Sequence, residues 1–186
     1  RSDEESEAVT TLAVADMTRL GTTGVVDHVP EQNASLAGIA PIARAYQRSG
    51  VRVSLALRVF DGRYDDIGDG GYAPADNPLT PRPAEALLEM MEEAISRWHR
   101  PDEGVKVYAG PSNSERCSDL LLAGAHALAD RYDTGFHGHL LETKVQRTAR
   151  LAASGETPMR PTLRSFRSIA RWWCTTPTLT RSWASA

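Results

Sequence analysis

Two imidazoles and one carboxylate fall within the seven residues from His137 to Thr143, which read His-Gly-His-Leu-Leu-Glu-Thr. Neutral imidazole is the commonest protein ligand for a catalytic divalent metal, and a carboxylate three residues away can exchange protons with water beside the ion. His139 is therefore a candidate metal ligand and Glu142 a candidate proton shuttle. The alternative is a hydrogen-bonded pair of histidines that lines the end of a strand.

This segment is predicted to lie where a strand runs into a helix. Residues 135–141 have the composition of a short strand, and the chain from Thr143 onward becomes polar and helical. In alternating α/β proteins, the carboxyl ends of the strands carry the chemistry. His137 and His139 share one face of such a strand by parity, so His137 is a candidate support for the first ligand.

The rest of the chain is predicted to alternate helix and strand. The expected helices span residues 3–20, 35–48, 80–98 and 118–129, and the expected strands span residues 24–28, 51–60, 105–109 and 135–141. Successive β-α units with short links predict a parallel sheet with right-handed crossovers, in either an open doubly wound sheet or a barrel. Residues 61–80 form a glycine-, proline- and aspartate-rich loop, which either shapes a pocket or is a disordered insert.

Two elements carry more specific expectations. The first helix should begin with a capping box between Ser2 and Glu5. Its apolar stripe is predicted at four positions, Val9, Ala13, Met17 and Leu20. The strand at residues 24–28 shows no alternation, so it is expected to be covered on both faces. Its last residues, Asp27 and His28, either support a site or simply finish the strand.

Composition limits the class of protein. The chain has 186 residues and a formal net charge of −3 at pH 7, which is typical of a globular domain and gives no overall basic footprint for nucleic acid. No apolar run approaches the roughly 20 residues that span a bilayer, and no leader is recognised, so a cytoplasmic location is expected. Cys117 and Cys174 have no metal-like spacing and are expected to be ordinary thiols.

Several motifs occur in an order that resembles a known family. They are Gly-Thr-Thr-Gly-Val-Val-Asp-His at residues 21–28, Gly-Val-Arg-Val at 50–53, Gly-Pro-Ser with Arg-Cys-Ser within 110–118, and His-Leu-Leu-Glu-Thr at 139–143 with Gln146. Together they resemble the amidohydrolase superfamily, in its cytosine deaminase, guanine deaminase and triazine chlorohydrolase branch. The resemblance covers about residues 4–146, and the His-x-x-Glu-Thr segment is its most specific part.

The resemblance implies a (β/α)₈ barrel of the TIM type that holds zinc, or alternatively iron, at the carboxyl ends of its strands. It implies that His139 binds the metal and that Glu142 shuttles protons in the hydrolytic deamination of a heterocyclic amine of the purine, pyrimidine or triazine type. The alternatives are a chlorohydrolase or amide hydrolase with the same site, or a non-catalytic α/β fragment. The expected partner is a small heterocyclic substrate, with no membrane and no nucleic acid.

Within such a barrel, four further side chains are candidates for supporting the site or contacting substrate. Arg58 and Asp61 would follow the third strand, and Ser112 and Arg116 would follow the fourth. The loops after barrel strands line the active sites of this fold.

The chain also departs from the family pattern. A complete barrel takes about 250 residues, so residues 1–146 would hold strands two to five only. The histidine pair expected on the first strand, the histidine on the sixth and the aspartate on the eighth are not found. The isolated chain is therefore expected to be inactive, and its open strand edges are expected to promote self-association, including homo-oligomers.

Residues 147–186 differ in composition from everything before them. They hold seven arginines and a single acid, Glu156. A shifted reading frame or a non-native end is the favoured interpretation, because the segment keeps no hydrophobic period. The alternative is a basic arm that binds an acidic partner or nucleic acid.

Overall fold

The computed structural model describes residues 2–30, 34–62, 82–140, 142–144 and 146–148, together with Leu151 and Gly155. Its elements are α1 (Asp3–Arg19), β1 (Gly24–Val29), α2 (Leu36–Ser49), β2 (Arg52–Leu57), α3 (Ala84–Trp98), η3 (Pro101–Glu103), β3 (Val105–Tyr108) and α4 (Asp119–Arg131). This order confirms the predicted alternation. Most of the 61–80 loop and of the 147–186 tail lie outside the described residues, so the predictions made for them stay predictions.

The three strands form one parallel sheet in the order β1-β2-β3. Beyond β3, the sheet continues only as isolated parallel bridges, Ala109 with Phe136 and Asn113 with His139. The predicted continuous strand at residues 135–141 is therefore wrong in detail, although the segment lies where a fourth strand belongs. Pro111, which has no N–H to donate, lies between the two bridged positions of the neighbouring segment and interrupts the ladder.

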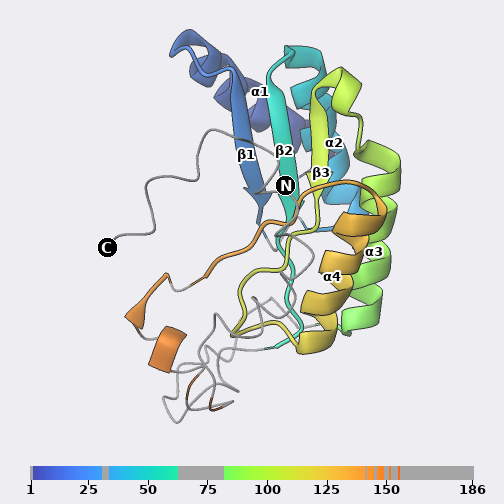
Figure 1. The fold of residues 1–186 in the computed structure, drawn as a ribbon. Helices are drawn as coiled ribbons and strands as arrows, with labels where there is room; N and C mark the ends of the chain where they lie inside the picture. The colour runs from blue at the N-terminus through green and yellow to red at the C-terminus, as the bar shows by residue number, and fades with distance from the viewer. Residues whose placement is uncertain are drawn as a thin grey trace, which may run out of the picture.

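All four helices lie on one side of the sheet (Figure 1). The strand residues on that side form the core with the helices, and Leu55, Leu57, Val105 and Val107 are fully buried. The opposite side of the sheet, here called the helix-free face, carries a more polar set that includes His28, Ser54, Lys106 and Tyr108. A sheet covered by helices on one side is typical of a barrel wall and not of a doubly wound sheet.

The burial predicted for β1 is wrong. Val26 is 57% exposed, because it lies on the helix-free face of the edge strand. Its neighbours Val25 and Val29 point toward the helices, and only Val29 is completely buried. Apolar residues therefore occupy both faces of this strand, but only the face toward the helices is covered in the described part of the chain.

Helix α1 confirms its predicted start but not its predicted buried stripe. Ser2 and Glu5 form the reciprocal capping box. Val9 and Leu20, placed in the stripe by their spacing, are 47% and 86% exposed, whereas Val14 is buried and packs in the core. Of the predicted stripe, Met17 alone is partly buried against the core, so spacing identified one core contact and missed Val14.

The remaining helix ends follow their sequence signals closely. Ser35 caps α2 through its hydroxyl, and Gly50 ends it in the left-handed conformation with φ 73°. Ser118 caps α4, as predicted. Helix α3 begins at Ala84, after Pro83, and not at residue 80 as expected. None of the helices in the described part of the chain is long and apolar enough to cross a membrane.

Candidate active site

Three imidazoles meet on the helix-free face, at the carboxyl ends of the strands. His28 comes from β1, whereas His137 and His139 come from the segment that follows α4. The ring centroid of His28 lies 4.7 Å from that of His137 and 4.9 Å from that of His139. His137 and His139 were predicted from strand parity to share a face, and the structure adds His28 to them.

The ring of His139 is held in one tautomer. Its backbone N–H donates to the carbonyl oxygen of Ser112 at 2.8 Å, and its ring Nδ1 lies 2.9 Å from the same oxygen. Because a carbonyl oxygen can only accept, Nδ1 is the protonated nitrogen, and in the neutral ring Nε2 carries the lone pair. This arrangement, in which the second ring nitrogen is bound to a backbone carbonyl, is the usual one for a metal-ligating histidine.

His137 and His28 share an environment that favours the neutral ring. Burial lowers the pKa of His137, and the neighbouring His139 lowers it further. Burial also lowers the pKa of His28 to about 4, with His137 as the next contributor. Nε2 of His28 lies 3.4 Å from the Gly110 carbonyl oxygen, and its buried Nδ1 has no hydrogen-bond partner among the described residues.

Asp27, although adjacent to His28, belongs to the other side of the sheet. Its carboxylate accepts a hydrogen bond from the hydroxyl of Tyr46 in α2 at 3.1 Å, and burial raises its pKa. The same burial, together with the carboxylate, raises the pKa of Tyr46. Of the two residues at the end of the strand, the aspartate therefore ties β1 to a helix, and only the histidine reaches the site.

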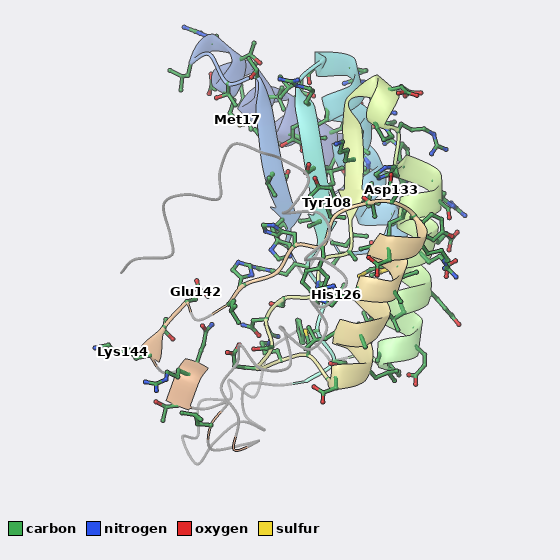
Figure 2. All side chains as sticks on the ribbon, viewed as in Figure 1. Met17, Tyr108, His126, Asp133, Glu142 and Lys144 are labelled. Carbon is green, nitrogen blue, oxygen red and sulfur yellow. The ribbon has the colours of Figure 1, made fainter. Side chains whose placement is uncertain are left out.

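Glu142 lies outside the histidine cluster. Figure 2 shows it on the segment that leaves the sheet, just before Lys144. Its carboxylate is exposed and accepts a hydrogen bond from the side-chain amide of Gln146 at 3.2 Å. Thr143 and Gln146 exchange side-chain to backbone hydrogen bonds in a capping-box pattern, which fixes the turn that carries Glu142. Its role as proton shuttle stays a prediction.

Two of the other predicted site residues have partners that position the surrounding loops. The carboxylate of Asp61 accepts from the backbone N–H of Ser118 at 2.8 Å and from its hydroxyl, so it binds the start of α4. The guanidinium of Arg116 is buried and lies 3.3 Å above the ring of Phe60. Both contacts join the loop after β2 to the loop after β3.

The last two predicted residues lie next to the histidines. Ser112 is buried, and its carbonyl oxygen is the group that binds His139. Arg58 follows β2, donates its backbone N–H to the carbonyl oxygen of Val29 at 3.1 Å, and adds to the lowering of the pKa of His28 through its charge.

A cavity of about 180 Å³ opens on the α4 side of the histidine segment. His137 and His139 line one part of it, and His126 and Phe136 line another. The rings of His126, labelled in Figure 2, and Phe136 stack at 3.9 Å with an angle of 4° between their planes. Both the stacked pair and two members of the histidine cluster therefore border this cavity.

The described residues include no group of three or more histidine, cysteine, aspartate or glutamate side chains arranged to hold a metal ion. The donor chemistry nevertheless fits a contribution to such a site, because His139 directs a lone pair away from its carbonyl anchor. A complete set of three or more protein ligands would therefore need residues from outside the described part of the chain.

Comparison with known proteins places this geometry in context. A family model described as "Amidohydrolase family" matches residues 2–178. A 5-methylthioadenosine/S-adenosylhomocysteine deaminase from Syntrophomonas wolfei is 27% identical over 151 residues, which is 81% of this chain and 29% of that protein. The chain thus spans under a third of the length of this relative.

Solved structures show the same fold. A mutant atrazine chlorohydrolase from Arthrobacter aurescens TC1, complexed with zinc and atraton, has a TM-score of 0.73 at 19% identity over 88% of this chain and 36% of that chain. A guanine deaminase from C. acetobutylicum with bound guanine has a TM-score of 0.63 at 16% identity, covering 81% and 32% of the respective chains.

Proposed function

Because the chain belongs to the amidohydrolase family, we propose that it is part of an enzyme that hydrolyses a carbon–nitrogen bond of a heterocyclic amine. The name of the deaminase relative supports a purine-type substrate. The observation that carries the proposal is the ring of His139, held by Ser112 in the tautomer that leaves Nε2 available.

His139 is the residue of this chain that would hold the divalent ion, with zinc preferred and iron as the alternative. When bound, the ion would supply Lewis acidity, which makes water nucleophilic near neutral pH and polarises the carbon under attack. The chain's own contribution is to orient the imidazole. The backbone and ring of His139 both bind the same carbonyl oxygen, so the edge of the ring that faces the backbone is set before any ion arrives.

Glu142 would carry protons between the attacking water and the departing amine. A carboxylate can accept a proton from water and then return it to a nitrogen leaving group, which is the general acid–base work of hydrolytic deamination. Its hydrogen bond from Gln146 holds one carboxylate oxygen, and the other oxygen remains available for this exchange. The exposed position of Glu142 fits a group that meets substrate from solvent.

Chlorohydrolysis on the same scaffold is the second candidate. It is supported by the likeness to the atrazine chlorohydrolase, but at 19% identity that likeness concerns the fold alone. The sequence relative at 27% identity is named a deaminase, which favours deamination. The 186-residue chain by itself is expected to lack turnover, because a catalytic zinc ordinarily needs three or more protein ligands. We further propose that the enzyme is cytoplasmic and that it forms homo-oligomers.

The test uses the complete polypeptide and measures metal stoichiometry, ammonia release from 5′-methylthioadenosine and guanine, and chloride release from a chlorotriazine. His139→Ala should lower the metal content because a direct ligand is lost. Glu142→Gln should keep the metal and lose about 10²- to 10⁴-fold in turnover, since an amide cannot accept a proton from water. His137→Ala should have the smallest effect of the three. Full activity of Glu142→Gln would refute the proposed role of that residue.

A further inference from the structure

His28 is the member of the histidine cluster whose role the sequence left open. Its ring stacks against that of His139, with 4.9 Å between centroids and 18° between planes. It meets the ring of His137 edge-on, at 4.7 Å and 90°. The two partners face each other much less closely, with centroids 6.3 Å apart. His28 is therefore the ring through which the three imidazoles are in contact.

We propose that His28 is a positioning residue, whose flat ring holds the plane of the His139 imidazole so that Nε2 points to the metal site. This inference rests on the proposed function only for the identity of the bound group. The orientation of the His139 ring is a property of the chain itself and is measured without metal.

A single hydrogen bond does not fix an imidazole completely. The bond from Nδ1 of His139 to Ser112 selects which edge of the ring faces the backbone. The torsion between Cβ and the ring is broad and roughly two-fold, so the plane can still tilt and the ring can flip. A second flat ring at near-parallel packing restricts that tilt. Together the two contacts define both the edge and the plane of His139.

His28 suits this task because its own ring is held by a distant part of the chain. Its Nε2 lies toward the carbonyl oxygen of Gly110, 82 positions away in sequence, and its ring meets that of His137 at right angles. Gly110 follows β3 and approaches β2 so closely that an added Cβ would lie 2.5 Å from the carbonyl oxygen of Leu57. The same carbonyl oxygen of Gly110 accepts a hydrogen bond from the Val59 N–H at 3.1 Å, so the anchor is tied to the segment that follows β2.

The test separates the ring of His28 from its hydrogen bond. Nitrogen-15 NMR of the metal-free chain reports the tautomer of His139 directly. His28→Ala removes both the ring and the bond, His28→Asn keeps a polar group without the ring, and His28→Phe keeps a ring without the bond. We expect His139 to stay in the Nδ1-protonated tautomer in wild type and in His28→Phe, and to populate both tautomers in the other two variants.

Metal affinity of the complete polypeptide provides the second measurement. The zinc affinity is measured by competition with a chromophoric chelator. It should fall by about 10- to 100-fold in His28→Ala and His28→Asn, as it does for other residues that orient a metal ligand. His28→Phe should bind zinc nearly as wild type does. His126→Ala is the matched control for the tautomer, because it removes a different ring stack on the same segment, that of His126 on Phe136 with 3.9 Å between centroids.

The proposal is overturned if His139 keeps a single tautomer in His28→Ala or His28→Asn, or if His28→Phe loses it as fully as these variants do. Should His28→Ala fail to fold, the comparison of His28→Asn with His28→Phe decides the matter alone. Failure of the proposed function would show differently, as normal turnover by Glu142→Gln, and would leave the tautomer measurement unchanged.

Discussion

Replacing Gly110 by alanine should disrupt both the sheet and the histidine cluster. An added Cβ would lie 2.5 Å from the carbonyl oxygen of Leu57, and 2.9 Å from its carbonyl carbon and its amide nitrogen. Favourable contacts between such atoms lie at about 3.5–4.0 Å, so the two backbones must separate by about 1 Å. Backbone, unlike a side chain, cannot rotate away. The glycine is needed here for space, since its φ is not in the left-handed region.

The cost can be worked out from the contacts that would be lost. Overpacking costs about 1–3 kcal/mol, and a backbone obstacle places this substitution at the upper end. Separation would also weaken the hydrogen bond from the Val59 N–H to the Gly110 carbonyl oxygen, 3.1 Å long, which is worth about 1 kcal/mol. We therefore expect Gly110→Ala to lower the free energy of unfolding by about 3–4 kcal/mol, a large share of the roughly 5–15 kcal/mol typical of a folded domain.

Urea unfolding measures this loss as a lower midpoint with an unchanged slope. Gly50→Ala is the matched control, because an alanine there would meet no atom within 4 Å and would only be forced into the left-handed region, at φ 73°. That strain costs about 1–2 kcal/mol. If Gly110→Ala unfolded at the midpoint of Gly50→Ala or above it, the close approach of β2 and the Gly110 segment would be wrong.

Smaller perturbations test the contacts around this site. In a Cys174→Ser background, a disulfide-exchange reagent should label Cys117 only after unfolding, because burial raises the pKa of its thiol to about 12; rapid labelling of the folded chain would contradict its burial. Ser118→Ala should lower the free energy of unfolding by about 1 kcal/mol through loss of the helix cap, measured by the urea midpoint. Burial raises the pKa of Asp27 above its ordinary value of 3.8, so the folded state binds the carboxyl proton more tightly than the unfolded state does. The free energy of unfolding should therefore fall as the pH rises from 3.8 through the pKa of the folded state. Asp27→Asn, which can still accept a hydrogen bond from Tyr46, should therefore lose this pH dependence. Urea unfolding below and above this pH interval measures it, and a variant whose free energy of unfolding changed with pH as much as that of wild type would contradict the prediction.

The sequence predicted those features that depend on local signals. The capping box at Ser2 and the helix starts near residues 35 and 118 were confirmed, because capping is decided within one turn of the chain. The family was also confirmed, and its motifs correctly placed the segment of His139 at the edge of β3. Local chemistry and motif order therefore identified the family and the fold, and the roles of His139 and Glu142 stay predictions.

Features set by distant neighbours could not be predicted in this way. Whether Val26 is covered depends on what lies across the sheet, and the sequence of β1 does not contain that information. His28 was considered but left open, because its partners His137 and His139 lie more than a hundred residues further along the chain. Parity could have separated it from Asp27, since neighbouring residues of a strand point to opposite faces.

The packing of the helices has a consequence for how this chain can acquire its structure. Each helix contacts the next one along the sequence, α1 with α2, α2 with α3 and α3 with α4. A chain emerging from the ribosome could thus add one β-α unit at a time to a growing core. The histidine cluster cannot form in this stepwise manner, because His28 must wait for Gly110 and for the segment after α4. A nascent chain would complete most of its hydrophobic core before its first and last imidazoles could meet.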